Sequence, residues 1–168
     1  MTKTWRIIKT PLQPGVWNMA LDESLLLHTA THASPPTLRL YSWQKPTLSL
    51  GYSQPYSDVD TAQLSSLGWD CVRRPTGGRA ILHTDEITYS LTAAADEPLV
   101  SGSLLESYQR ISSALQIALE LLGASTQADQ KVSKTPDQSK SNPVCFETPS
   151  NFEITWNGKK LIGSAQAR

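Results

Sequence analysis

Short apolar-rich runs, several with alternating polar positions, predict a chain built from many β-strands. Such runs lie at residues 5–8, 37–43, 46–53, 69–74, 79–83 and 87–95. Near the C-terminus, Asn157 and Gly158 separate two further strand-like runs, which is a strong signal for a hairpin with a type I′ turn. The pattern therefore predicts short strands, several of them paired as hairpins.

Two earlier segments carry helix signals instead. The run NMALDESLLL predicts a helix capped by the Asn18 side chain, with Asp22 and Glu23 near the positive end of the helix dipole. A short helix is expected near residues 58–66, ended by Gly68.

A long helix is expected between Ser103 and Gly123. Ser103 and Glu106 form a capping-box pattern, apolar residues follow at spacings of three and four, and glycine is typical just past a helix end. Helices, strands and hairpins are mixed along the chain. We therefore expect an α+β fold, with a mixed or antiparallel sheet flanked by helices, rather than a doubly wound parallel sheet.

The stretch 126–143 is polar, shows no apolar periodicity and predicts a mobile surface loop. Too few residues follow it for a second domain, so we expect one domain over residues 1–168.

Composition and charge narrow the function classes. Of the 168 residues, 15 are basic and 15 acidic, which argues against a general nucleic-acid or membrane-surface protein. No apolar run approaches the roughly 20 residues that span a bilayer, and the N-terminus lacks a signal-peptide core, so a cytoplasmic location is expected. The three histidines and two cysteines show no metal-ligand spacing, so no metal site is expected.

The first candidate for chemistry is the segment RRPTGGRAILH, residues 73–83. Gly77 and Gly78 allow a turn whose backbone amides a ligand can approach, and Arg73 and Arg74 offer donors for carboxylate or phosphate. Neighbouring strand residues point to opposite faces, so only one of the two arginines should face a given pocket. His83 ends the second strand, where Thr84, Asp85 or Glu86 could set its tautomer. The alternatives are a hairpin with solvated arginines and a structural histidine.

The last predicted strand, residues 160–166, gathers polar side chains on one face. Lys160, Ser164 and Gln166 share that face with Ile162, because strand side chains alternate. This face could line a polar pocket, or it could be the solvent-facing side of an edge strand.

Cys145 precedes the C-terminal hairpin, and it is either a small core hydrophobe or a nucleophile. A nearby ammonium such as that of Lys160 would lower the pKa of the thiol and favour the reactive thiolate. Cys71 lies in the apolar-flanked run WDCVR and is expected to be an inert core thiol.

Five blocks in order resemble the lipoate–protein ligase A family of the biotin/lipoate protein ligase fold. They are NMALDE, TLSLGYSQ, RRPTGGRAILH, EITYS and GKKLIGSAQAR. The segment VCFETPSNFEI is similar to the branch of octanoyl-[acyl-carrier-protein]:protein N-octanoyltransferases that keep a cysteine in this loop.

The resemblance implies acyl transfer without a cofactor. Cys145 would take the octanoyl group from octanoyl-acyl carrier protein as a thioester, and a lysine of a lipoyl-domain protein such as the glycine cleavage H protein would then receive it. Lys160 would activate the thiol or stabilise the oxyanion. Residues 73–83 would form one wall of the acyl pocket, which Ser164 and Gln166 would also line.

Two alternatives stay open. One is an ATP- and Mg²⁺-dependent lipoate–protein ligase that acts through an acyl-adenylate, and the other is a remnant without catalytic activity. Members of the family continue past the position of Arg168. The resemblance therefore implies that residues 1–168 are the N-terminal part of the catalytic domain and that its C-terminal portion is missing.

Overall fold

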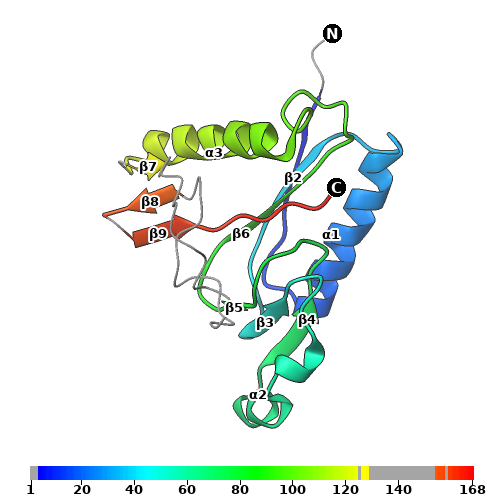
Figure 1. The fold of residues 1–168 in the computed structure, drawn as a ribbon, viewed down its shortest axis with the longest axis vertical. Helices are drawn as coiled ribbons and strands as arrows, with labels where there is room; N and C mark the ends of the chain where they lie inside the picture. Colours follow the sequence, from blue (N-terminus) through cyan, green and yellow to red (C-terminus); the bar gives the residue numbers. More distant parts are fainter. Residues whose placement is uncertain (1–3, 125, 129–153, 158) are drawn as a thin grey trace. The chain divides into compact units, whose positions relative to one another are not determined.

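The computed structural model describes residues 4–124, 126–128, 154–157 and 159–168 (Figure 1). The chain divides into two compact units, one ending at Glu97 and the other running from Pro98 to Gln166. Ala167 is grouped with the first unit and Arg168 with the second.

The first unit contains two three-stranded sheets of mixed direction. In one sheet, β2 pairs in parallel with β1 and antiparallel with β6; in the other, β3 pairs in parallel with β4 and antiparallel with β5. The strands are β1 (Arg6–Lys9), β2 (Thr37–Tyr41), β3 (Thr47–Leu50), β4 (Asp70–Arg73), β5 (Ile81–His83) and β6 (Thr88–Thr92). The predicted α+β class with a mixed sheet is confirmed.

The prediction that neighbouring strands pair as hairpins is wrong for the first unit. Within residues 4–97, consecutive strands that pair are parallel, and a helix lies between them in the chain. The strands β4 and β5, which flank the glycine-rich turn in sequence, both pair with β3 and not with each other. Parallel neighbours need a crossover connection, which α1 and α2 supply here.

Helix α1 (Gly15–Ala30) begins three residues earlier than predicted, after Pro14, and no side chain caps it. Asn18 is fully buried inside the helix, where its amide donates to the Ser42 carbonyl at 3.2 Å. Asp22 is also buried and lies beyond the first turn of the helix. Both residues serve tertiary contacts that the local sequence does not reveal. The predicted cap at Asn18 is therefore wrong.

Helix α2 (Thr61–Leu67) confirms the second helix prediction. The Asp60 carboxylate accepts from the Gln63 amide at 2.9 Å at its start, and Gly68 ends it with φ of 67°. A short 3₁₀ turn, η1 (Tyr56–Asp58), precedes it.

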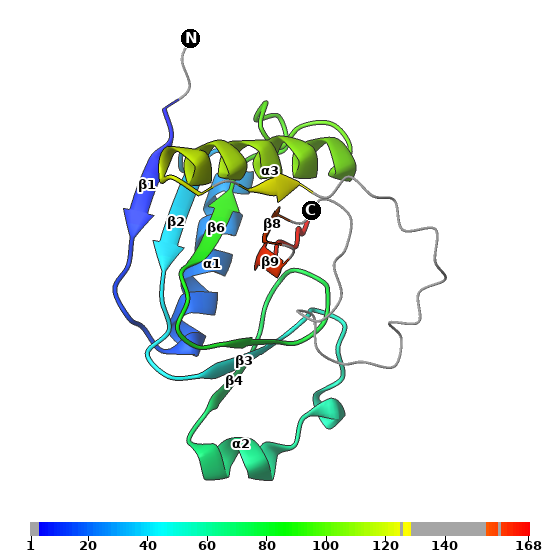
Figure 2. The same cartoon turned by 90° about the vertical axis from the view of Figure 1, so that its left-hand side faces the viewer.

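The core of the first unit lies where α1 meets both sheets. Helix α1 contacts β2, β4 and β6 (Figure 2). Tyr41, Trp43 and Val72 form a buried apolar cluster against which Met19 packs from the helix. The apolar positions of β2 and β4 and the segment after β2 therefore meet beneath one helix.

The second unit contains α3 (Leu104–Leu121), which confirms the long helix and its capping box. The Glu106 side chain accepts from the Ser103 amide at 2.7 Å, while the Ser103 hydroxyl accepts from the Glu106 amide. The Ser103 amide and the Ser103 hydroxyl, the latter at 2.8 Å, both donate to the Glu106 carboxylate, and these two bonds lower the pKa of that carboxyl. Gly123 follows the helix with φ of 87°.

The C-terminal hairpin prediction is confirmed by β8 (Ile154–Trp156) and β9 (Lys159–Ile162), which pair antiparallel. Asn157 between them has a positive φ of 50°, as a type I′ turn requires. A short strand β7 (Gln127–Ala128) pairs with β8, so the expected loop is wrong at these two residues. The rest of that predicted loop, from residue 129, lies outside the described residues.

The last strand ends at Ile162, earlier than predicted. Beyond it, the Tyr108 hydroxyl of α3 donates to the Ser164 carbonyl at 3.0 Å, and the Ser107 hydroxyl donates to the Gln166 side chain at 2.8 Å. These bonds to α3 take the place of further strand pairing. In the described part of the chain, no helix is long and apolar enough to cross a membrane.

Candidate functional site

The glycine-rich turn follows β4 and lies on the segment that leaves β3. A Cβ atom added to Gly51 would stand 1.9 Å from the Gly78 carbonyl oxygen, so the two backbones are in direct contact. The Tyr52 amide donates to the Thr76 carbonyl at 2.9 Å and joins the same two segments. Gly78 has φ of 91°, which confirms the unusual backbone angle expected there, whereas a Cβ at Gly77 would meet nothing within 4 Å.

The two arginines point to opposite sides of β4, as the strand period predicted. Arg74 is buried, and its guanidinium donates to the Ser49 carbonyl at 2.8 Å and the Ser49 hydroxyl at 3.1 Å. Its other amino group donates to the carbonyls of Gly77 at 2.9 Å and Arg79 at 2.6 Å. Arg74 thus connects the glycine-rich turn to β3.

Arg73 is exposed and holds the neighbouring loop. Its Nη1 donates to the carbonyls of Gly51 at 2.8 Å, Tyr52 at 3.0 Å and Gln54 at 2.7 Å. Arg73 therefore holds the segment 51–54, and Arg74 holds the glycine-rich turn that contacts it. Both do so through backbone carbonyls.

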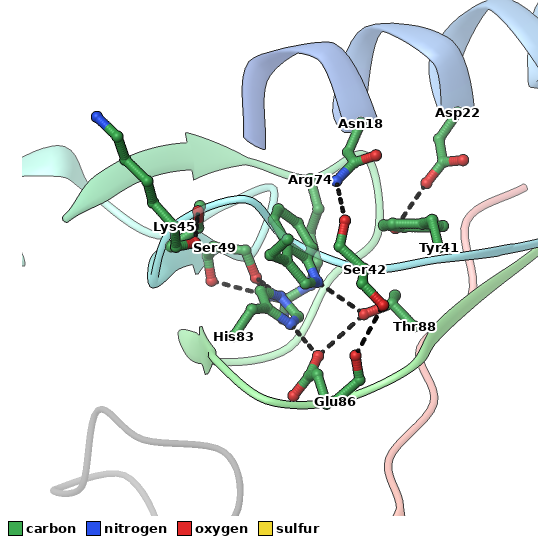
Figure 3. Close-up of polar contacts among 12 residues, drawn as sticks. Asn18, Asp22, Tyr41, Ser42, Lys45, Ser49, Arg74, His83, Glu86 and Thr88 are labelled. Atoms are coloured by element: carbon green, nitrogen blue, oxygen red, sulfur yellow. Dashed lines mark hydrogen bonds and ion pairs between the residues drawn. The ribbon is translucent and has the colours of Figure 1, made fainter. Parts of the chain in front are cut away.

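His83 lies in a closely bonded polar cluster. Its Nδ1 is 2.5 Å from the Glu86 carboxylate and its Nε2 is 2.8 Å from the Ser49 hydroxyl. The imidazole stacks on the Trp43 indole, with ring centroids 4.1 Å apart and planes 12° apart. The Thr88 hydroxyl donates to the Glu86 carboxylate at 2.9 Å and accepts from the Trp43 ring N–H at 2.8 Å. Figure 3 shows the bonds of His83 with Glu86 and Ser49 and the bond of Thr88 with Glu86.

The charge of Glu86 follows from these contacts. Burial by itself would raise the pKa of this carboxyl, but the hydrogen bond from His83, the charge that His83 carries whenever its ring is doubly protonated, and the Thr88 hydroxyl together outweigh it. The net result is a lowered pKa. Glu86 is therefore ionised at neutral pH, and its carboxylate accepts a hydrogen bond from the protonated Nδ1 of His83.

A second polar cluster lies beneath α1. Arg39 is fully buried, and its guanidinium forms an ion pair of 2.7 Å with Asp22. The same carboxylate accepts from the Tyr41 hydroxyl at 2.9 Å and the Ser90 hydroxyl at 2.7 Å, and Asn18 accepts from Arg39 at 2.5 Å. Burial, followed by the charge of Asp22, raises the pKa of Tyr41, so its hydroxyl stays a donor.

Ser42 connects the two clusters. Its carbonyl accepts from the Asn18 amide of the second cluster, and its hydroxyl donates to the Glu86 carbonyl of the first at 3.3 Å (Figure 3). Asn18 of the NMALDE block is therefore linked through Ser42 to the loop that carries Glu86.

Cys71 is only partly buried, so the expected place in the core is wrong for this thiol. Burial raises the pKa of this thiol, against the opposing effect of Arg73. In the described ranges, no three His, Cys, Asp or Glu side chains are grouped as metal ligands.

The predicted site residues that the structure describes are divided between the two units. Arg74, Gly77, Gly78 and His83 belong to one cluster, and Arg73 lies on the opposite face of β4. The remaining described candidates belong to the other unit: Lys160 on β9, opposite Thr155 in the pairing, and Ser164 and Gln166 beyond it. Cys145 lies outside the described residues.

Sequence reasoning missed Ser49, Trp43 and Thr88, and it named Glu86 only as one of three candidates. Ser49 carried a usable signal, because a polar residue inside the apolar run TLSL needs a partner when that strand is buried. Trp43 and Thr88 had no such signal. Their contacts with the histidine site arise from strand order.

Replacing Gly51 with alanine should distort the turn, because the new methyl group would overlap the Gly78 carbonyl oxygen. We expect a loss of about 1–3 kcal/mol in unfolding free energy, measured by urea denaturation. Gly77→Ala is the matched control, since a Cβ there meets nothing within 4 Å. Equal losses in both variants would contradict the close contact.

Comparison with known proteins gives the family and the fold of this chain. A model of the lipoyl protein ligase A/B catalytic domain matches residues 14–168. The octanoyltransferase LipM of Carboxydothermus hydrogenoformans is 46% identical over 99% of this chain and 61% of that protein. LipM of Moorella thermoacetica is 43% identical over the same shares. The chain thus spans about three fifths of the length of these curated relatives.

Solved structures show the same fold. A lipoate–protein ligase A bound with ATP superposes with a TM-score of 0.75 at 22% identity, covering 100% of this chain and 62% of that one. The match of the family model over residues 14–168 shows that the chain belongs to the lipoyl protein ligase A/B catalytic domain family.

Proposed function

We propose that this protein transfers an octanoyl group from acyl carrier protein to a lysine of a lipoyl-domain protein, through a thioester on Cys145. The observation that carries the proposal is 43–46% identity, over nearly all of this chain, to proteins named octanoyltransferase LipM.

The reaction consists of two balanced exchanges at one carbonyl carbon. The Cys145 thiolate attacks the octanoyl thioester, a new C–S bond forms, and the acyl carrier thiolate leaves and takes up a proton. The ε-amine of the acceptor lysine then attacks. A C–N bond forms and the C–S bond to Cys145 breaks. The proton that the amine loses is taken up by the Cys145 thiolate. The two thioesters have similar energies, so neither ATP nor another cofactor is needed.

Lys160 supplies the positive charge in this proposal. An ammonium beside the thiol favours the thiolate, and it stabilises the oxyanion that forms during each attack. Lys160 lies half-buried on β9, in the hairpin that follows Cys145 in the chain.

The glycine-rich turn forms one wall of the acyl pocket. Arg74 and Arg73 support that wall by holding the backbone of residues 77–79 and 51–54. The space around Gly77 leaves its backbone open to a ligand, and His83, Ser164 and Gln166 complete the substrate-binding set. Burying an octanoyl chain at about 0.8 kcal/mol per CH₂ would contribute about 4–5 kcal/mol to its recognition.

The partners follow from this chemistry. The donor is octanoyl-acyl carrier protein, and the acceptor is a lipoyl domain such as that of the glycine cleavage H protein. We place the reaction in the cytoplasm, where reducing conditions keep Cys145 as a thiol.

The decisive experiment measures the intact mass of the protein after incubation with octanoyl-acyl carrier protein and no ATP. We expect the mass to increase by one octanoyl group, located on the Cys145 peptide and lost when a lipoyl domain is added. Acylation of the lipoyl domain that requires ATP would instead favour the ligase. No transfer under either condition would favour a remnant without activity.

Replacing Lys160 with alanine should slow alkylation of Cys145 at neutral pH. Loss of a nearby ammonium raises the pKa of a thiol, and a rise of one unit reduces the thiolate about tenfold. The rate is followed by mass spectrometry of the Cys145 peptide under excess iodoacetamide. Lys159→Ala is the matched control, because Lys159 is exposed and its side chain alternates with that of Lys160. An equal rate in both variants and the wild type would rule out Lys160 as the activator.

A further inference from the structure

A continuous series of hydrogen bonds joins Glu86 to the glycine-rich turn. It runs from the Glu86 carboxylate to His83, then to the Ser49 hydroxyl, then to the Arg74 guanidinium. Arg74 ends it on the carbonyls of Gly77 and Arg79. The series crosses β5, β3 and the end of β4, so it connects segments that are distant in the chain.

The acceptors and donors in this series determine the tautomer of His83. An ionised carboxylate only accepts, so the Nδ1 that faces it at 2.5 Å carries the proton. In the neutral imidazole, Nε2 then has a lone pair and accepts a hydrogen bond from the Ser49 hydroxyl at 2.8 Å. With its proton directed at His83, Ser49 presents its oxygen to Arg74, which donates to it at 3.1 Å.

The opposite tautomer would break this order at two points. The Nδ1 lone pair would face the Glu86 carboxylate without a proton between them. Nε2 would donate to the Ser49 oxygen, which would then receive hydrogen bonds from both His83 and Arg74. The Ser49 hydroxyl proton would have to point away from His83. The stack on Trp43 opposes rotation of the imidazole out of this arrangement, because the indole is itself bonded to Thr88.

We propose that Glu86 is a positioning residue that sets the tautomer of His83 and, through Ser49 and Arg74, the shape of the glycine-rich turn. As a contribution to acyl transfer, this role rests on the proposed function, since the turn acts there as a wall of the acyl pocket. As a property of the fold, it can be measured without substrate.

The first test observes the tautomer and the turn directly in the full chain. Long-range ¹H–¹⁵N spectra distinguish Nδ1–H from Nε2–H imidazoles, and the His83 signals are assigned by their loss in His83→Gln. We expect Nδ1–H in the wild type and in Glu86→Gln, because the amide oxygen of Gln still accepts. In Glu86→Met we expect Nε2–H, together with shifted backbone amide signals of Gly77, Gly78 and Arg79. Glu120→Met, at an exposed position of α3, is the matched control and should leave both sets of signals unchanged.

The second test measures acylation of the chain by octanoyl-acyl carrier protein. We expect Glu86→Met to lower the acylation rate by about 10- to 100-fold, because a misplacement of about 1 Å in a substrate-positioning segment can cost about a hundredfold, and we expect Glu86→Gln to restore most of the rate. Equal losses in the Gln and Met variants would show that the charge matters and not the positioning, which would overturn the proposal.

The two tests also separate this proposal from the proposed function. If the wild type transfers no acyl group, the proposed function fails, while the tautomer and the turn amides still decide the role of Glu86. A wild-type Nε2–H tautomer, or turn amides that Glu86→Met leaves unmoved, overturns the role of Glu86 regardless of activity. Should Glu86→Met not fold, the tautomers of the wild type and Glu86→Gln decide it alone.

Discussion

Replacing Cys145 with serine should abolish the octanoyl adduct and reduce transfer to a lipoyl domain by at least about a thousandfold. A serine hydroxyl is not ionised at neutral pH and has no activating base in the proposed mechanism, whereas a cysteine beside an ammonium is partly thiolate. A thousandfold loss corresponds to about 4 kcal/mol of added barrier. The measurement is the initial rate of lipoyl-domain acylation, with intact mass of the enzyme in parallel.

Cys71→Ser is the matched control for this experiment. Burial raises the pKa of the Cys71 thiol, so its removal should leave acylation within about twofold of the wild type. Retained transfer in Cys145→Ser would contradict the thioester mechanism. If the retained transfer required ATP, an acyl-adenylate route would take its place.

Replacing Asp22 with alanine should destabilise the first unit by about 3–5 kcal/mol, the cost of leaving a buried charge without its partner. The Arg39 guanidinium is fully buried and forms its 2.7 Å ion pair with Asp22. The hydroxyls of Tyr41 and Ser90 would lose the same acceptor. The free energy of unfolding is measured by urea denaturation, with thermal unfolding as a second readout.

A double replacement separates the cost of the unpaired buried charge from the loss of packing. Replacing Asp22 with leucine and Arg39 with methionine together should cost less than Asp22→Ala alone, since no charge then remains buried. Glu23→Ala, at an exposed neighbour on the same helix, should change stability by less than about 0.5 kcal/mol. If Asp22→Ala cost no more than this control, the buried pair would contribute nothing measurable.

Local patterns were sufficient where a segment's own residues decide its structure. The capping box at Ser103 and Glu106, the left-handed end of α2 at Gly68 and the hairpin at Asn157 all formed as predicted. In each case the bonds or backbone angles involve residues within a few positions of one another. The opposite orientations of Arg73 and Arg74 follow in the same way from the two-residue period of a strand.

Predictions failed where a distant residue decides the outcome. Asn18 reads as a helix cap, but Arg39 and Ser42 supply it with buried partners, and the helix begins earlier. The strands β4 and β5 read as a hairpin, but both pair with β3 because that strand offers an open edge on each side.

By itself, the sequence determined the α+β class, the family blocks and the residue types available for chemistry: the glycine-rich turn, His83, Lys160 and Cys145. Only the tertiary structure decided what surrounds them. It brought Ser49 from β3 and Glu86 from the segment before β6 to the two nitrogens of His83. In the folded chain, the guanidinium groups of Arg73 and Arg74 both donate to backbone carbonyls. The physical reason is that hydrogen-bond partners of a buried polar group are set by strand order, and strand order is a property of the whole chain.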